Sequence, residues 1–485
     1  MNIDEVRARI RPEGETVYRI PRFGPMRVDG RFYATPKLLR CLKTDESLLQ
    51  IGNVATLPGI VGDAMAMPDI HWGYGFPIGG VAAFAVDDGV ISPGGVGYDI
   101  NCGVRLMATR LTRPELTARL RELAVGIFRN VPAGVGSSRK DLKLGPRDED
   151  RVLAAGAGWA IKSGYGAKED LECIEDGGRF PDADPDAVSG KAKERGRSQL
   201  GTLGSGNHFI EIGCVDEVFD PDAAKAMGLF EGQVTVTVHT GSRGLGYQVC
   251  DDFIVDMKKA ARHYGIELPD PQLCCAPVNS PEGRRYRGAM AAAGNYAFAN
   301  RQIIGHYVRE AFLEALKITP RALGMRLVYD LAHNIAKIET HTVNGVETEV
   351  CVHRKGATRS FGPGRPELSR RFRELGQPVI VPGDMGTCSY VLLGTERAVE
   401  ETFGSTCHGA GRVLSRHAAM KAAKGRSIAG ELEKRGILVM AASRGTLAEE
   451  MPDAYKDVGE VVDAVVKAGL NRRVARLRPL AVIKG

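Results

Sequence analysis

The chain has 485 residues, 43% hydrophobic and 26% charged, and its 65 basic and 59 acidic side chains give a formal net charge of +6. These values suit a large folded enzyme, and the slight positive charge is compatible with nucleic acid binding without requiring it. No run approaches the ~18 apolar residues of a membrane span, and the N-terminus lacks the apolar core of a signal peptide. We therefore expect a cytoplasmic protein with no membrane partner, whose ten cysteines stay reduced.

Strands and helices are predicted in turn along the chain. Short apolar or alternating runs that end in glycine-rich polar loops predict strands at 80–86, 103–109, 208–214, 233–238, 325–329, 349–353, 378–381 and 389–393. Helical patterns lie at 113–130, 149–161, 289–316, 412–423 and 458–468. The segment 164–197 is charged and rich in glycine, aspartate and proline, so we expect a surface excursion, either a flexible solvated loop or a mobile element that contacts substrate.

Five side chains of metal-ligand type follow this pattern of strands and loops. Asp99 and Cys102 are three residues apart across a turn and could face one ion. A capping aspartate beside a buried structural cysteine would give the same sequence pattern. His208, His239 and His333 each lie at a predicted strand edge, where α/β folds place ligand sites. Each histidine alone is more often an ordinary core or loop group. Together the five exceed the four ligands of one zinc and suit two ions that share a thiolate, without naming the metal.

A sixth feature is the small-residue turn 407–412, which begins Cys407-His408-Gly409. Glycines let a phosphate approach backbone N–H groups, and Arg412 could neutralise its oxygens. The turn therefore predicts a histidine, His408, that attacks a phosphorus atom or binds a phosphate, with Cys407 as a bystander. A lone histidine beside glycine is otherwise an ordinary loop residue, so the interpretation depends on the neighbouring metal-type ligands.

Basic side chains accompany these loops. Arg412 and Arg416 are one turn apart on the predicted helix 412–423 and should share a face, directly after the glycine-rich turn. A solvated charged helix face is the alternative. The loop 352–359 follows a predicted strand and adds further basic side chains.

At this point the chain resembles the RtcB-type RNA-splicing ligases, and the resemblance covers essentially its whole length. The motifs that carry it are 68–75, 99–103, 206–211, 239–244, 333–334, 353–357, the His408 turn and 483–485. The resemblance implies a GTP- and Mn²⁺-dependent enzyme that joins RNA 3′-phosphate or 2′,3′-cyclic phosphate ends to 5′-hydroxyl ends, in tRNA splicing or RNA repair. It implies a histidine–GMP intermediate and then an RNA carrying GMP on its 3′-phosphate. It leaves the need for an activating protein partner open.

The resemblance also implies roles for individual residues. His408 takes GMP, and two manganese ions, with zinc as the alternative by ligand type, are held by Asp99, Cys102, His208, His239 and His333, with Cys102 shared. Guanylate contacts are expected at Asn207, His208, Phe209, Ile210, Glu211, His333, Asn334, Pro382, Gly383, Asp384, Met385, Ser389, His408, Gly409, Ala410, Gly411, Tyr455 and Lys484. At Asp384 some members carry serine. RNA phosphates or pyrophosphate are expected at Arg243, Lys355, Arg359, Arg412 and Arg416.

Because these positions run from Asp99 to Lys484, we expect one compact α/β domain over residues 1–485, with mixed sheets and helical insertions. Two rival functions remain. One is a dinuclear-metal phosphodiesterase or phosphatase in which His408 is only an acid or a base. The other is a non-catalytic RNA-binding scaffold, which would have no use for five converging metal ligands.

Overall fold

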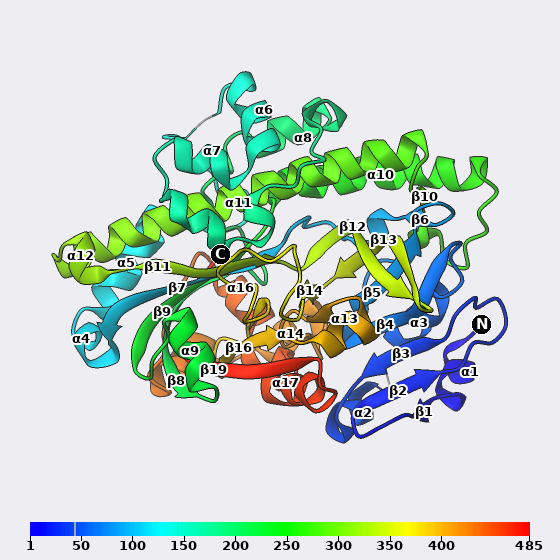
Figure 1. The fold of residues 1–485 in the computed structure, drawn as a ribbon. Helices are drawn as coiled ribbons and strands as arrows, with labels where there is room; N and C mark the ends of the chain where they lie inside the picture. Colours follow the sequence, from blue (N-terminus) through cyan, green and yellow to red (C-terminus); the bar gives the residue numbers. More distant parts are fainter. Residues whose placement is uncertain (43–44, 143) are drawn as a thin grey trace.

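Two large sheets carry the loops of interest in the computed structural model, which describes residues 1–42, 45–142 and 144–485 (Figure 1). The first sheet has the order β1 (Arg11–Pro12), β2 (Val17–Ile20), β3 (Gly30–Tyr33), β4 (Ile60–His71), β5 (Ile78–Ala85), β13 (Val346–Lys355), β12 (Asn334–Val343). The second has the order β11 (Arg326–Ala332), β7 (Gly103–Thr112), β9 (Gln233–Thr240), β8 (Phe209–Val218), β19 (Asn471–Lys484), β16 (Ser389–Gly394), β15 (Pro378–Val381).

Both sheets are mixed, which confirms the predicted α/β class with a single compact domain. Most neighbours are antiparallel, whereas β3 pairs in parallel with β4, and β18 (Leu438–Ala441) pairs in parallel with β19. All eight predicted strands are present, β15 with the predicted bounds and the others with shifted ends. Among the strands that were not predicted are β4, β12 and β19. Among the described residues no helix is long and apolar enough to cross a membrane.

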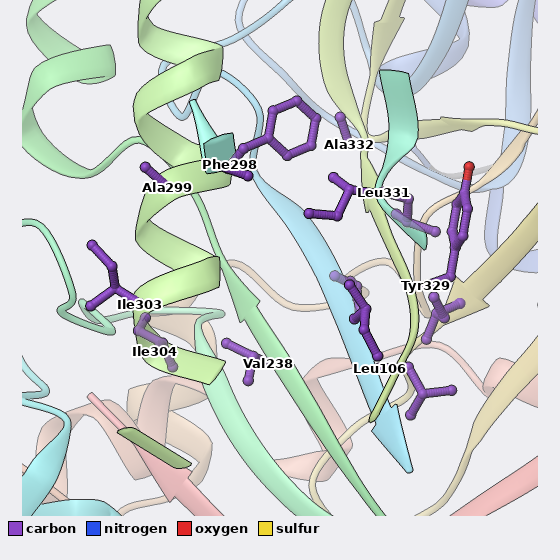
Figure 2. Packing of buried hydrophobic residues seen from close by; sticks show 14 of the residues in the cluster. Leu106, Val238, Phe298, Ala299, Ile303, Ile304, Tyr329, Leu331 and Ala332 are labelled. Atoms are coloured by element: carbon purple, nitrogen blue, oxygen red, sulfur yellow. The ribbon is translucent and has the colours of Figure 1, made fainter. Parts of the chain in front are cut away.

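Two long helices, α10 (Arg243–His263) and α11 (Pro281–Leu316), run across one side of the molecule (Figure 1). Helix α11 is buried along most of its length because it lies between the second sheet and the segments α6 (Pro146–Ala155), α7 (Ala157–Lys162) and α8 (Gly190–Gly196). Figure 2 shows Phe298 and Ile304 of this helix among side chains of the strands, including Leu106 and Val238. Full burial of such a side chain is worth about 1.5–3 kcal/mol, so this contact fixes the helix on the sheet.

Four predicted helices have different bounds. The helix expected at 289–316 begins earlier, at Pro281, as α11, because Ser280 caps it by accepting from the backbone of Gly283. The helix expected at 113–130 is divided into α4 (Arg113–Thr117) and α5 (Leu120–Asn130), and the one at 149–161 is divided into α6 and α7. Gly156 separates the second pair because it adopts φ +56°, and a Cβ there would meet the carbonyl oxygen of Gly178 at 2.2 Å. The helix expected at 412–423 begins at Arg416 as α14 (Arg416–Ala422), because Ser415 caps it by accepting from the backbone of Ala418.

Helix α10 was not predicted, since Gly244 and Gly246 in its first turn are poor helix formers. The segment 164–197 packs against α11 and β11 and is not a solvated loop, since Glu175 accepts from the backbone N–H of Ala332 at 3.0 Å. It contains short 3₁₀ helices and α8, and it buries Phe180 and Val188 in the main apolar cluster. Helix α17 (Val458–Lys467) agrees with the predicted 458–468.

A buried ion-pair cluster joins α11 to the ends of three strands. The carboxylate of Asp330 on β11 accepts from Arg301 Nε at 2.9 Å and from Arg105 Nε at 2.7 Å, and all three side chains are fully buried. Arg301 also donates to the carbonyl oxygens of Asn101 at 2.8 Å and of Thr240 at 3.0 Å. Asn101 adopts the left-handed conformation, with φ +51°, and Arg301 holds it there through backbone and side chain.

We predict that Asp330→Ala lowers the free energy of unfolding by about 3–5 kcal/mol, because it leaves two buried guanidinium groups without their carboxylate. Urea unfolding followed by circular dichroism measures the change. Glu314→Ala, an exposed position on the same helix as Arg301, is the control and should stay within about 0.5 kcal/mol of the parent. Equal stability of the two variants would contradict a structural role for the cluster.

Candidate metal and nucleotide site

The five predicted metal-type ligands come together at one end of the second sheet. Asp99 and Cys102 belong to the turn before β7, His208 precedes β8, His239 is next to the last residue of β9, and His333 follows β11. Because β7 pairs with β9 and β11, and β9 with β8, the ends of these four strands lie side by side. The sheet therefore collects side chains that are far apart in the chain.

Their ligand atoms form two groups that share one sulfur. Cys102, His239 and His333 make the first group, and Asp99, Cys102 and His208 make the second, with the ligand atoms of each within 4.8 Å of one another. Cys102 Sγ lies 3.3 Å from His239 Nε2 and 3.5 Å from His208 Nε2. His239 Nε2 lies 3.2 Å from His333 Nε2, and His208 Nε2 lies 2.8 Å from Asp99 Oδ2.

These distances fit metal ions. Nitrogen ligands about 2.0–2.1 Å from an ion in tetrahedral geometry are about 3.4 Å apart, close to the spacing of Cys102, His239 and His333. Two imidazole nitrogens this close form an N–H···N hydrogen bond when one of them carries the proton, and an ion between them would instead accept both lone pairs. The residues present therefore fit two divalent ions, with Cys102 a member of both ligand groups.

Burial keeps the histidines ready to act as ligands. It lowers the pKa of His239 and His333 well below the ordinary value, and neighbouring imidazoles add to the effect, so both rings are neutral near pH 7. Burial and the charge of Asp99 raise the pKa of the Cys102 thiol well above its ordinary value. Since a coordinating thiol is deprotonated by the ion itself, the thiol is expected to lose its proton only when an ion binds.

His408 is held by a carboxylate that the sequence analysis did not assign to the site. Asp69, fully buried in β4, accepts from His408 Nδ1 at 2.5 Å and from the His408 backbone N–H at 2.9 Å. Burial opposes ionisation of Asp69, but the charge and hydrogen bonds of His408 outweigh it and lower the pKa of that carboxyl group. With Nδ1 bound in this way, His408 directs Nε2 away from Asp69, and its ring lies 4.9 Å from that of His333.

A cavity of about 370 Å³ opens above His408 and both ligand groups. Of the expected guanylate-contacting residues, the following line it: Asn207, Phe209, Glu211, His333, Asn334, Pro382, Gly383, Asp384, Met385, His408, Gly409, Ala410, Gly411, Tyr455 and Lys484. The first and second sheets both contribute walls, so the cavity exists only where the two meet.

Three expected contacts do not line the cavity. Successive side chains of a strand alternate between faces, so Phe209 and Glu211 of β8 face the cavity while Ile210 packs in the main apolar cluster. His208 belongs to the ligand groups instead. Ser389 is buried behind the loop and its hydroxyl accepts from Gly383 N–H.

One wall of the cavity is a polar cluster around Glu450, a fully buried carboxylate that was not predicted. Its oxygens receive the hydroxyl of Tyr455, the guanidinium of Arg412 at 3.1 Å and the ammonium of Lys484 at 3.7 Å. Lys484 Nζ also donates to the carbonyl oxygen of Gly206 at 2.9 Å. These contacts orient Lys484 and Tyr455 in the cavity.

The structure corrects the roles expected of three basic residues. Arg359 is buried and pairs with Asp176 at 2.9 Å, so it is part of the core and not of an RNA surface. The Lys355 ammonium lines the cavity but donates to the carbonyl oxygens of Tyr74 and Phe76, and burial lowers its pKa to about 7. Arg412 does not share a helix face with Arg416, because it precedes α14 and is held by Glu450.

Arg243 and Arg416, the other two basic residues, remain available to bind phosphate groups. Arg416 is exposed at the start of α14 and lines the cavity. Arg243, at the start of α10, donates to the hydroxyl groups of Thr202 and Ser137, and the nearby charge of Asp99 favours its protonated form although burial lowers its pKa. Either guanidinium could bind a phosphate without giving up an ion pair with a carboxylate among the described residues.

Sequence reasoning missed Asp69, His71, Tyr74, Tyr98 and Glu450. The motif 68–75 entered only as part of the family resemblance. Because strand β4 was not predicted, the sequence did not indicate that Asp69 contacts His408. Nothing in the local sequence distinguishes the buried Glu450 from the half-buried Glu449 beside it. Asp384 lines the cavity, but its carboxylate accepts from Gly386 N–H at 2.7 Å and from the Thr387 hydroxyl at 2.8 Å.

A cavity with two groups of metal-type ligands and a carboxylate-oriented histidine is typical of enzymes that act on phosphate groups. A sequence profile described as tRNA-splicing ligase RtcB matches residues 50–485. Proteins named tRNA-splicing ligase RtcB from Thermococcus kodakarensis and Archaeoglobus fulgidus are 55% and 54% identical to this chain. The alignments cover 96% and 95% of the chain and 97% and 95% of the relatives.

A protein of Mycobacterium tuberculosis named RNA-splicing ligase RtcB is 53% identical over 90% of the chain and 100% of its own length. The chain therefore belongs to the RtcB family. This confirms the resemblance inferred from the motifs, and the chain is an RNA ligase.

Because Cys102 belongs to both ligand groups, its removal should affect both metal sites. After dialysis against Mn²⁺, we expect about two ions per chain in the parent, about one in His333→Ala and fewer than one in Cys102→Ala, because Cys102 belongs to both ligand groups. Inductively coupled plasma mass spectrometry measures the ratio. Cys388→Ala, a half-buried thiol outside both groups, is the control. Two ions retained in Cys102→Ala would rule out a shared ligand.

Proposed function

We propose that this chain joins RNA 3′-phosphate or 2′,3′-cyclic phosphate ends to 5′-hydroxyl ends, with GTP as the energy source and Mn²⁺ as the metal. The observation that carries the proposal is the His408 imidazole, held through Nδ1 by Asp69 beside both ligand groups. The names of the Thermococcus kodakarensis and Archaeoglobus fulgidus relatives specify tRNA splicing, and broken tRNA halves are accordingly the proposed substrates, with other broken RNA as the alternative.

The first step is attack of His408 Nε2 on the α-phosphorus of GTP. Asp69 keeps the proton on Nδ1, so the Nε2 lone pair is free, and the carboxylate stabilises the positive charge that develops on the ring. The P–N bond forms as the P–O bond to pyrophosphate breaks. Asp99, Cys102, His208, His239 and His333 would hold two divalent ions, whose charge supports reaction between anionic groups.

Lys484 and Glu211 are proposed to read the base. The Lys484 ammonium would donate to guanine O6, and Glu211 would accept from guanine N1–H and its amino group. Adenine presents the opposite pattern at both positions, so it would leave these groups unpaired. Glu211 Oε1 has no hydrogen-bond partner among the described residues, as expected of a group that awaits a ligand.

The second and third steps transfer GMP to the RNA and then seal the strand. An oxygen of the RNA 3′-phosphate attacks the phosphorus on His408, which regenerates the imidazole and forms a pyrophosphate link to GMP. The 5′-hydroxyl of the other strand then attacks the RNA phosphorus, and GMP leaves with the electron pair. A cyclic end must first be hydrolysed to the 3′-phosphate. Arg243 and Arg416 are proposed to bind the RNA phosphates.

Nitrogen and sulfur ligands suit zinc as well as manganese, so the metal is proposed from the family and not from the ligand types. The rival function is a dinuclear phosphodiesterase or phosphatase, in which His408 would never carry GMP. A hydrolase has no use for a guanosine pocket, and the cavity walls with Glu211, Lys484 and Tyr455 favour the ligase.

We predict that the protein incubated with Mn²⁺ and GTP labelled at the α-phosphorus retains an acid-labile, alkali-stable label. His408→Ala should retain none, since among the described residues the Asp69 carboxylate accepts from no other side chain. Labelled ATP is the control for base selection. The ligase mechanism fails if the parent retains no label, or if His408→Ala labels as well as the parent.

We predict that the affinity for guanosine depends on pH through Glu211. Burial, helped by the charge of Asp384, raises the pKa of Glu211 to about 8, so the group is mostly neutral at pH 7. Since only the ionised carboxylate can accept from guanine N1–H and from the amino group at the same time, guanosine should bind about tenfold more tightly per pH unit as pH rises from 6 toward 8. Titration calorimetry with guanosine, which carries no phosphate, measures the slope. Glu211→Gln should flatten it, and an equally steep slope in that variant would contradict the assignment.

A further inference from the structure

Three tyrosines form a continuous row of rings that leads out of the reaction cavity. Tyr74, in the loop after β4, meets Tyr98 edge to face, with ring centroids 5.8 Å apart. Tyr98 stacks on Tyr247, with centroids 4.7 Å apart and ring planes 25° from parallel. Tyr74 and Tyr98 line both the cavity of His408 and a neighbouring groove of about 860 Å³ along α10.

The outer end of the row is open to solvent. Tyr247 lies in the first turns of α10, and 45% of its surface is exposed. The exposed Arg195 of α8 places its guanidinium 5.2 Å from the centre of this ring. Planar guanidinium groups and tyrosine rings are the surfaces on which proteins stack single-stranded bases.

Charge along the groove limits what can bind there. Asp251, one turn after Tyr247 on α10, lines the groove with Asp252 and Asp256, and Tyr247 adjoins the groove through Tyr98, on which it stacks. The groove has four aspartates against two lysines and one arginine, so it does not favour a run of phosphates. A terminal nucleoside is different, because its base can stack on Tyr247 while only its 3′-side phosphate needs a cation.

The position of the row also distinguishes the two RNA ends. The tyrosines belong to the β4–β5 loop, the turn before β7 and α10, and none of these elements carries the proposed guanosine contacts on β8 and β19. In phosphoryl transfer the attacking and leaving oxygens are roughly in line across the phosphorus. The leaving GMP therefore occupies one wall, and the attacking 5′-hydroxyl has to approach from another.

We propose that Tyr247, with Tyr98 behind it, stacks the base of the 5′-hydroxyl-terminal nucleoside of the incoming RNA strand. The inference rests on the proposed function and adds the subsite for its second substrate. This end carries no 5′-phosphate, which fits the acidic groove. Arg195, an exposed planar cation, lies over the Tyr247 ring and donates to Gln248 Oε1 at 2.9 Å, so the entering base has to displace this guanidinium from the ring.

Tyr247 is the residue to test, because Tyr98 adjoins the ligand Asp99 and its replacement would disturb the metal groups. The assay starts from RNA that already carries GMP on its 3′-phosphate, so that only strand joining is measured. We expect Tyr247→Ala to raise KM for the 5′-hydroxyl strand about tenfold, the factor for one lost base stack, while Tyr247→Phe stays close to the parent. Tyr264→Ala, another exposed tyrosine just beyond the other end of α10, is the matched control.

The decisive comparison removes the base instead of the ring. A strand with an abasic 5′-terminal nucleotide should raise KM of the parent by the same factor and cause no further rise in Tyr247→Ala, since both changes remove one contact. If the two increases in KM multiply, or if Tyr247→Phe raises KM as much as Tyr247→Ala does, the assignment of this subsite is contradicted. Labelling of His408 by GTP reports separately on the fold of each variant, and its absence in the parent would instead reject the proposed function.

Discussion

The buried guanidinium of Arg301 is the interaction on which the site depends most. It comes from α11 and binds Asp330, three residues before His333, the carbonyl oxygen of Asn101, next to Cys102, and that of Thr240, next to His239. One rigid planar group therefore sets the relative positions of three strand ends, each beside a metal-type ligand. Its position, fully buried and paired with a carboxylate, makes these strand ends stiff.

The reactive histidine depends on the other sheet. Asp69 comes from β4 of the first sheet, while the ligand groups sit at the end of the second, so the distance from His408 to the ligands depends on how the two sheets meet. Asn334 bridges them, since it donates to the carbonyl oxygen of Asp99 and accepts from Gly356 N–H at 2.8 Å. The cavity is thus braced from both sides before any substrate enters, which is the preorganisation that phosphoryl transfer needs.

Charges in the site fall into two kinds. Arg359, Arg412 and Lys355 are bound to carboxylates or carbonyl oxygens and serve to hold the protein's own loops. Arg243 and Arg416 have no such carboxylate partner within the described ranges 1–42, 45–142 and 144–485, which leaves them suited to a polyanion. A basic residue in a polar loop therefore predicts a phosphate contact only when its neighbours in space leave it free.

The sequence by itself determined the α/β class and eight of the strands, and it predicted the five metal-type ligands and His408, because apolar alternation and the residue types of glycine-rich loops are local properties. Only the tertiary structure decided that Asp69 lies beneath His408, that Glu450 organises Lys484 and Tyr455, and that Arg359 is buried. Each of these contacts joins residues far apart in the chain. In a sequence, a buried aspartate such as Asp69 or a buried arginine such as Arg359 cannot be told from an exposed residue of the same type. The burial and the partners that determine what these side chains do exist only after the sheets have packed.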